Sequence, residues 1–443
     1  MPLIVDLDDL NYLHQVSNMP KKNLNETIDN IVDYLVKNCA LLINDIEKNK
    51  KPVTLINDEI LKYIKSNKIS VVSQNNLNML LTSINNYIWG YGPIQSFIND
   101  RDISDVYIFN KNCVAIKKYG KLQFTDIKFP TDKSLLNFCY NLAIKNGGSL
   151  SDINAKQILS DSKSQKDAIL RIDIVIDPIT YTGSQVEIRR LPKKKKSFND
   201  LIKEGMLNAE IQKYLITAVK SGLNIVWTGR GGSGKTTLIN ACLDYVPKQD
   251  VQLIMQESEE LFTSHKATFM QKVKKKQGES DVEYTLKDLT INALLMSLDR
   301  MVIGEIKDEE AMEFFNAVYS GHIGWTSVHS PSSEECMNKI VHLMKYSKTD
   351  LPKEDLMEML TEIDLIIYME DYKCCELTEV AGWDEQKKKP LFNPVFKYNT
   401  VKDKSDGSYR GEFIRIGDSC EKVMKKVKKA VVSGKLKGDG DIV

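Results

Sequence analysis

A glycine-rich loop lies at Gly229–Thr236, where the chain reads "GRGGSGKT" and matches the pattern G-x-x-x-x-G-K-[ST]. A loop that wraps a polyphosphate must aim several backbone N–H groups inward, and glycine permits the dihedral angles that this requires. The apolar run "LNIVWT" before the loop predicts a strand, and "TLINACLDYV" after it predicts a helix. The alternative is a glycine-rich turn without a ligand. We predict that nucleotide is bound by Gly229, Arg230, Gly231, Gly232, Ser233, Gly234, Lys235, Thr236 and Thr237.

Two side chains of this loop have a predicted role in the chemistry. Lys235 would place a point charge at the β and γ phosphates of a nucleotide, and the Thr236 hydroxyl would bind Mg²⁺. The helix that follows would direct its free N–H groups and its positive dipole end at the same anion. ATP and Mg²⁺ are therefore the expected cofactors.

Carboxylates follow two further apolar runs. In "DRMVIGEIKD" a predicted strand over Met301–Ile303 is followed by Glu305, which can order or deprotonate an attacking water, directly or near Mg²⁺. In "VQLIMQESEEL" another predicted strand ends in the acids Glu257, Glu259 and Glu260. Ligands of parallel sheets bind at the carboxyl ends of the strands, so these acids suit Mg²⁺ and water positioning. Solvated acidic loops are the alternative.

Two of the five histidines fall in the stretch "SGHIGWTSVHS". His322 precedes the predicted strand "WTSV" and His329 ends it, so the two side chains need not touch. Zinc is the poorer interpretation, because helical zinc pairs favour an i, i+4 spacing and no cysteine or acid with ligand spacing stands nearby. A zinc site that includes Cys336 and His342 is the remaining alternative.

The elements that must position these residues form a helix–strand alternation after Met206, which is typical of a parallel sheet. Upstream, the short runs Val106–Phe109 and Val114–Lys118 predict a hairpin, and "AILRIDIVIDPITYTGSQVEIRRLP" predicts paired strands. No strand is expected after about residue 395. The predicted organisation is a helical amino-terminal extension (1–85), a small α/β domain (86–192), a linker (193–205), an ATPase domain (206–395) and a basic carboxyl-terminal tail (396–443).

The linker contains four consecutive lysines, Lys193–Lys196. A solvated hinge is the simpler interpretation, and contact with acidic lipid or with a protein partner is the alternative.

Bulk composition limits the possible classes of function. The chain has 443 residues, so more than one domain is expected, and its net charge of +1 gives no field that favours nucleic acid. The eight cysteines are scattered, which favours reduced thiols over a disulfide framework. Nowhere do 18 apolar residues run together, and the amino terminus "MPLIVDLDDLNYLHQ" lacks a signal-peptide pattern. A cytoplasmic protein is expected.

In order and spacing, the stretches "TGRGGSGKTTL", "MQESEEL", "INALLMSLDRMVIGEIKDEEA" and "SGHIGWTSVHS" resemble the motifs of the type II/IV secretion ATPases. The stretches "YGPIQSFINDRDISDVYIFNKNCVAIKKYGKLQFTDIKF" and "VEIRRLPKKKKSFNDLIKEGML" are similar to the branch that drives Flp/Tad-type pili. The resemblance covers residues 86–385 and implies an α/β fold with a RecA-like phosphate-loop domain. It also implies a homo-hexameric ATPase that powers pilus assembly or secretion, at the inner face of the cytoplasmic membrane, with a membrane platform protein as partner.

The resemblance also implies roles by position. Glu305 matches the catalytic glutamate, and Lys235 and Thr236 match the nucleotide and Mg²⁺ residues. Acids of the acidic box are matched by Glu257 and Glu260, and the histidine box by His322 and His329, which would sense the γ-phosphate or couple hydrolysis to movement about the 193–205 hinge. Whether only His322 does so, with His329 bracing the sheet, stays open. Arginines that reach toward nucleotide are matched by Arg171, Arg189 and Arg190, with solvated strand-end arginines as the alternative.

The chain departs from the family pattern at a few positions. Gln256 stands where a Glu is usual, Glu257 where an Asp is usual, and Lys307 replaces a usual Arg after Gly-Glu. "LLMSLDR" lacks the arginines and the Pro that relatives often carry ahead of its Asp. Hydrolysis is still expected, slowly or with help from partners. The alternatives are a nucleic-acid translocating (conjugation) ATPase, which the net charge disfavours, and a nucleotide-binding scaffold with weak turnover.

Overall fold

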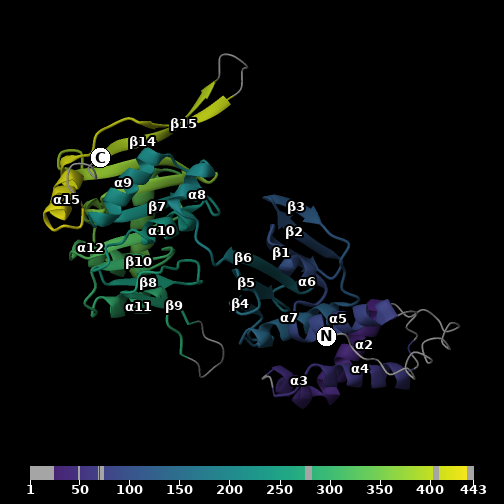
Figure 1. Cartoon of the computed structure of the whole chain (residues 1–443). Helices are drawn as coiled ribbons and strands as arrows, with labels where there is room; N and C mark the ends of the chain where they lie inside the picture. The colour runs from purple at the N-terminus through teal and green to yellow at the C-terminus, as the bar shows by residue number, and fades with distance from the viewer. Residues whose placement is uncertain are drawn as a thin grey trace. The chain divides into compact units, whose positions relative to one another are not determined.

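The computed structural model describes residues 24–436, apart from 48–49, 68, 70–73, 275–281 and 403–408. The chain divides into two compact units, Met1–Lys193 and Lys194–Val443 (Figure 1). The amino-terminal stretch "MPLIVDLDDLNYLHQ" and the last residues of the predicted tail lie outside the described residues.

The first unit begins with helices that pack on one another. Their described bounds are α2 Leu24–Asn38, α3 Ala40–Glu47, α4 Thr54–Ser66 and α5 Gln74–Trp89. Ile28, Ile31 and Leu35 recur at helical spacing on α2 and are buried, with Cys39 and Leu42 partly buried against the same core. The part of the predicted amino-terminal extension that the structure describes is thus helical.

A six-stranded antiparallel sheet follows within the described part of this unit, in the order β3-β2-β1-β6-β5-β4. It is preceded by η1 Gly92–Ile94 and α6 Gln95–Asn99, and α7 Asp132–Lys145 packs against one face of the sheet through Leu135, Phe138 and Leu142. The predicted hairpin is confirmed, because β1 pairs antiparallel with β2. The strands are β1 Ile103–Asn110, β2 Cys113–Lys118, β3 Lys121–Phe124, β4 Lys156–Asp161, β5 Ala168–Val175 and β6 Gln185–Pro192.

The second unit is built on a sheet whose nine described strands run in the order β15-β14-β13-β12-β7-β11-β10-β8-β9. The strands from β12 to β9 are parallel, and β13 to β15 are added antiparallel at one side. The strands are β7 Ile225–Gly229, β8 Gln252–Gln256, β9 Thr268–Lys272, β10 Arg300–Ile303, β11 Ile323–Val328, β12 Leu365–Glu370, β13 Lys373–Asp384, β14 Lys389–Lys402 and β15 Tyr409–Arg415.

Helices cover both faces of this sheet, because apolar side chains alternate along its strands. Ile225 and Trp227 of β7 enter a core shared with α8, α9, α10 and α15, while Val226 enters a second core shared with α11 to α14. These helices are α8 Phe198–Lys203, α9 Ala209–Lys220, α10 Lys235–Leu243, α11 Leu286–Ala293, α12 Glu310–Tyr319, α13 Ser333–Met344, α14 Lys353–Met359 and α15 Glu421–Val432; η2 Lys345–Ser347 and η3 Leu360–Glu362 are short turns.

The strand order identifies the fold class. The strand that leads into the glycine-rich loop, β7, lies between β11 and β12, and β10 and β8 follow outward in parallel. This is the order of RecA-like phosphate-loop domains, and it brings the ends of β7, β8, β10 and β11 to one edge of the sheet. The second unit is therefore a RecA-like domain, and the first holds the smaller α/β sheet and the helical extension.

The expectation of no strand after about residue 395 is wrong. Strand β14 runs on to Lys402 and pairs with β15, and Val395 and Phe396 are buried in the core. Pro390 and Pro394 lower the strand propensity of this segment, since proline cannot donate to the ladder. Pro394 is accommodated next to a register shift in the pairing with β13. The predicted basic tail contains the helix α15 Glu421–Val432.

The four lysines of the predicted linker have different surroundings. Lys193 donates to the carbonyls of Ser162 and Gln165 at 2.6 and 2.8 Å, within the first unit. Lys195 contacts Asp244 in the second unit. The linker also contains α8, which Ser197 and Asp200 begin with a reciprocal capping box. The run is thus only partly a solvated stretch.

Candidate functional site

The glycine-rich loop has the backbone that its sequence predicts. Strand β7 ends at Gly229 and α10 begins at Lys235, with Gly234 at the N-cap in the left-handed region (φ 98°). A Cβ at Gly229 (φ 140°) would lie 2.1 Å from the Met369 carbonyl oxygen. Only glycine fits this position, because a side chain would clash with the backbone of β12 and strain its own.

Lys235 is folded back onto this loop. Its Nζ donates to the carbonyls of Gly229 (2.8 Å) and Arg230 (2.9 Å), and the residue is only 6% exposed. Burial lowers the pKa of the ammonium, and the nearby carboxylates of Glu305 and Glu260 oppose that shift. Neutral carbonyls compensate a buried charge weakly, so the amine is suited to exchange them for an anion.

The loop fits a polyphosphate with its cation. The Ser233 hydroxyl is buried and has no hydrogen-bond partner among the described residues. Thr236 stands half-buried in the first turn of α10, where free N–H groups also point outward. Lys235, Thr236 and this turn together supply the donor set expected for a nucleotide bound with Mg²⁺.

Glu305 follows β10 and contacts the side chains of His329 and Lys307. Its Oε1 lies 2.7 Å from His329 Nε2, and its Oε2 lies 3.1 Å from Lys307 Nζ. Burial alone would raise the pKa of the carboxyl, but the hydrogen bond from His329 and the charge of Lys307 outweigh it and lower the pKa to about 2. Glu305 is therefore a carboxylate at any physiological pH.

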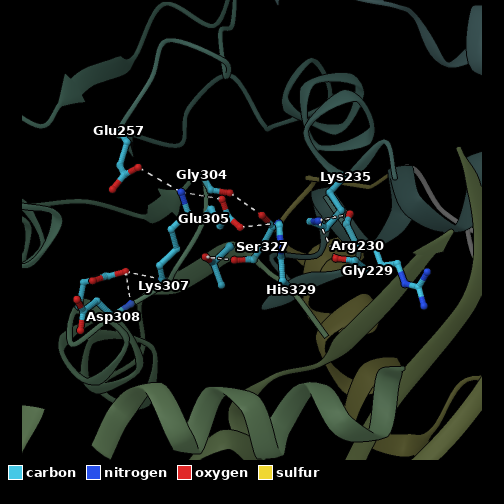
Figure 2. A network of polar contacts seen from close by, with 12 residues as sticks. Gly229, Arg230, Lys235, Glu257, Gly304, Glu305, Lys307, Asp308, Ser327 and His329 are labelled. Atoms are coloured by element: carbon cyan, nitrogen blue, oxygen red, sulfur yellow. Dashed lines mark hydrogen bonds and ion pairs between the residues drawn. The ribbon is translucent and has the colours of Figure 1, made fainter. Parts of the chain in front are cut away.

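Lys307 also connects the two acidic strand ends. Its Nζ lies 3.2 Å from Glu257 Oε2, so one ammonium contacts a carboxylate from β8 and one from β10 (Figure 2). Burial would lower the pKa of Lys307, but Glu305 and Glu257 outweigh it and raise the pKa. In the sequence, Lys307 stands out only as a departure from the family pattern. Its position two residues after Glu305 is the sequence feature that could have indicated a role at the site.

The acidic loop after β8 is shaped by Gln256. The amide oxygen accepts from the backbone N–H groups of Glu260 and Leu261, and the amide nitrogen donates to the Leu261 carbonyl at 3.0 Å. A glutamate could not make that last contact, which gives a physical reason for this departure. Asn240 of α10 donates to the Glu260 carbonyl, so the acidic loop is tied to the helix of the phosphate loop.

The two histidines lie at opposite ends of β11. His329 contacts Glu305, and a Cβ at Gly231 would meet its Cε1 at 3.4 Å, so His329 lies between Glu305 and the loop (Figure 2). His322 precedes the strand, and its Nδ1 lies 3.2 Å from the Ala317 carbonyl oxygen. Six strand residues separate the two, a length of roughly 20 Å. The structure thus brings together Lys235, Glu257, Glu305 and His329, but not His322.

The three arginines predicted to reach nucleotide all belong to the sheet of the first unit. Arg189 of β6 contacts Asp105 at 2.8 Å and keeps 45% of its side chain exposed. Arg190 is turned to the other face, where it donates to the Ile98 carbonyl and contacts Asp167 at 3.4 Å with 9% exposed. Arg171 of β5 lies opposite Arg189. Arg190 is thus committed to contacts within its own unit, and the nucleotide role of all three stays a prediction.

The sequence predicts no membrane-spanning helix, and a zinc site near Cys336 and His342 is the alternative for the histidines. Among the described residues, no three His, Cys, Asp or Glu side chains are grouped as metal ligands. Cys336 is buried in the core, and His342 contacts the Tyr346 hydroxyl at 3.0 Å. No helix over the same residues is long and apolar enough to cross a bilayer.

Comparison with known proteins gives one family and several distant relatives. A family model described as type II/IV secretion system protein matches residues 89–395. The uncharacterized protein MJ0900 of Methanocaldococcus jannaschii is 23% identical over 323 residues, which cover 71% of this chain and 56% of that protein. Protein VirB11 of Agrobacterium tumefaciens is 28% identical over 194 residues, covering 43% and 56%. The matched segments therefore span little more than half the length of these two relatives.

Solved structures resemble the chain at low identity. The pilus retraction motor PilT with bound ADP has a TM-score of 0.46 at 16% identity, covering 75% of this chain and 84% of that one. The VirB11 ATPase of the Brucella suis type IV secretion system has a TM-score of 0.32 at 20% identity, covering 62% and 90%.

Proposed function

The chain belongs to the type II/IV secretion system protein family, and on this premise we propose that it hydrolyses ATP to power pilus assembly or protein secretion across the cell envelope. The observation that carries the proposal is the gathering of Lys235, Glu305 and His329 at the strand ends beside the glycine-rich loop. A loop for phosphates and an ionised carboxylate for water are the two parts that ATP hydrolysis requires.

In this proposal the nucleotide replaces the internal contacts of Lys235. The ammonium leaves the carbonyls of Gly229 and Arg230 for the β and γ phosphates, and the loop N–H groups take the remaining phosphate oxygens. Thr236 would hold Mg²⁺, which supplies positive charge to the phosphate oxygens when bound. Residues 229–237 therefore bind and orient the nucleotide.

Glu305 acts on the attacking water. The water oxygen forms a bond to the γ phosphorus, the bond from that phosphorus to the β–γ bridging oxygen breaks, and ADP leaves with the bridging oxygen. The proton lost by the water passes to the Glu305 carboxylate, which later releases it to solvent. His329 orients the carboxylate through Oε1. Glu257 and Glu260 lie in the acidic loop after β8, at the same edge of the sheet.

The wider assembly is proposed from the family resemblance. We propose a homo-hexamer that works at the inner face of the cytoplasmic membrane on a membrane platform protein, in a machine of the Flp/Tad type. Light scattering after size-exclusion chromatography, with a non-hydrolysable ATP analogue and Mg²⁺, tests the hexamer. A monomer at all concentrations in the presence of analogue would contradict it.

The direct test of the activity compares Lys235→Ala with Lys248→Ala, an exposed lysine after α10. ATP binding and phosphate release are measured on the full chain with Mg²⁺. We expect Lys235→Ala to lose roughly 100-fold or more in turnover, as for loss of a pre-organised phosphate contact, and Lys248→Ala to match the wild type. Equal turnover in both variants would contradict the assignment.

The two alternative functions give different results in the same assay. A nucleic-acid translocase would show turnover stimulated strongly by DNA. A scaffold would bind ATP with a Lys235-dependent affinity but release no phosphate, even as an assembled hexamer. The proposed motor hydrolyses ATP without DNA.

A further inference from the structure

Both carboxylate oxygens of Glu305 are occupied in this structure. Oε1 faces His329 at 2.7 Å, and Oε2 faces Lys307 at 3.1 Å. A general base must place an oxygen within hydrogen-bond distance of the water from which it takes a proton. Each oxygen keeps a second lone pair for a water, but the two contacts together fix the orientation of the carboxylate, so a change in either one changes the direction in which it faces.

Lys307 has a second partner that makes such a change possible. Strands β8 and β10 are parallel neighbours, with Met255 opposite Ile303, and each chain continues two residues further to a glutamate. Glu257 Oε2 and Glu305 Oε2 lie 3.2 and 3.1 Å from the same ammonium. Lys307 can therefore leave Glu305 without becoming an unpaired charge.

The backbone beneath Lys307 is held while its side chain is shared. The buried Glu310 side chain accepts from the backbone N–H groups of Lys307 (2.6 Å) and Asp308 (3.0 Å) at the start of α12. A fixed backbone limits the ammonium to the space between the two strand ends. Within that space the Lys307 ammonium contacts the carboxylates of Glu257 and Glu305.

Exposure favours exchange between the two carboxylates. The side chains of Lys307, Glu257 and Glu305 are 48%, 39% and 27% exposed. Water screens ion pairs that are this exposed, so the lysine can exchange one carboxylate for the other at little cost. Two contacts of similar length, 3.2 and 3.1 Å, suit a side chain that moves during the reaction cycle.

We propose that Lys307 is a positioning residue for Glu305, which it restrains through Oε2 in the resting site and releases by shifting to Glu257. Glu257 thus acts through Lys307 and has no direct contact with water or Mg²⁺ in the reaction. The inference rests on the proposed ATPase function and adds how the base is made available.

The test is the effect of Glu257→Gln on turnover in three backgrounds. In the wild-type background, Glu257→Gln leaves Lys307 with Glu305 as its charged partner. We therefore expect kcat to fall about 5- to 10-fold with KM for ATP unchanged, a size typical of the coupling between residues in contact. In the Lys307→Arg background, which keeps the charge, a similar fall is expected. In the Lys307→Met background, Glu257→Gln should cost nothing further. Glu385→Gln, an exposed site in the β13–β14 turn, is the control for removal of a carboxylate.

The possible outcomes separate this inference from the proposed function. If the wild-type chain releases no phosphate, the proposed function fails first. If the wild type is active and Glu257→Gln is neutral, or costs the same factor in the Lys307→Met background, the inference fails alone. A change in KM instead of kcat would also overturn it, since Glu257 would then contribute to nucleotide binding.

Discussion

Both edges of the RecA-like sheet carry charged side chains, but the two sets differ in their exposure to solvent. At the carboxyl edge, where β7, β8, β10 and β11 end, Lys307 and His329 are about half exposed and Glu305 accepts contacts from both. At the amino edge, where strands begin, Asp364 is fully buried and Asp250 is 2% exposed. The charged groups of the first edge are thus open to solvent, and the carboxylates of the second are not.

The amino edge uses its charges to attach the carboxyl-terminal helix. Asp364, just before β12, contacts Lys422 at 3.1 Å and Lys426 at 2.5 Å, both on α15, and accepts from the Asn224 backbone. Asp250, before β8, contacts Lys435 at 2.7 Å. Three lysines of the predicted basic tail, Lys422, Lys426 and Lys435, thus contact buried carboxylates.

Arg300, the first residue of β10, completes this edge. It is fully buried, lies over the Trp325 ring at 4.3 Å and contacts Asp250 at 3.6 Å. Burial lowers the pKa of the guanidinium to about 10, even though Asp250 opposes the shift. Charges this deep are costly to leave unpaired, whereas half-exposed charges rearrange at little cost. The same sheet therefore has one edge suited to stability and one suited to chemistry.

The largest stability effect is expected at the amino edge. Asp364→Ala leaves two lysines of α15 without their buried partner, and we expect a loss of about 3–5 kcal/mol in the free energy of unfolding. Urea denaturation followed by tryptophan fluorescence measures it. The control Asp418→Ala, which is fully exposed, should change that free energy by less than about 1 kcal/mol. Turnover per folded molecule should stay within about threefold, because the sites are distant.

The two histidines test the difference between the edges on a single strand. His329→Ala removes the contact to Glu305 Oε1, and we expect phosphate release to slow by about 10- to 100-fold, the range of a lost charge-assisted hydrogen bond of roughly 1.5–3 kcal/mol. His322→Ala removes a contact to a backbone carbonyl at the far end, and turnover should stay within about threefold. A larger loss for His322→Ala would mean that the amino edge takes part in the chemistry.

The smallest effect concerns the pKa of Glu305. Because its folded pKa of about 2 lies below the ordinary 4.5, its ionisation stabilises the fold above pH 4.5, and that contribution is lost as the pH falls toward 2. Lys307→Gln should raise the pKa toward 4.5 and reduce this contribution. Carbon NMR of the labelled carboxyl, titrated from pH 7 to the lowest pH at which the chain stays folded, measures the shift. A pKa of Glu305 unchanged from that of Lys248→Gln would contradict the role of Lys307.

Much of this site could be predicted from local sequence, because glycine spacing and apolar runs carry local information. The glycine-rich loop, the strand before it and the position of Glu305 after β10 follow from such patterns. The shared contact of Lys307 could not be predicted, since it depends on β8 and β10 being neighbours although 43 residues lie between the end of β8 at Gln256 and the start of β10 at Arg300. Strand β14 could not be predicted either, because its prolines and lysines obscure the apolar alternation of a strand. Its pairing with β13, which the sequence does not show, stabilises it.

The sequence also could not predict which charged side chains contact one another. "KVMKKVKKAVV" indicates a basic amphipathic helix, and only the fold shows that Lys422 and Lys426 face a buried aspartate. Asp364 itself stands in "TEIDLIIYM" without any local signal that distinguishes it from an exposed turn residue.

The central claim is that Glu305 at the carboxyl edge activates the water that attacks ATP. The most direct test is phosphate release by Glu305→Gln at saturating ATP and Mg²⁺, with ATP affinity measured on the same preparation. We predict a fall of about 10²- to 10⁴-fold in turnover, the usual contribution of a general base, with ATP affinity retained. Turnover at the wild-type rate in Glu305→Gln would contradict the account.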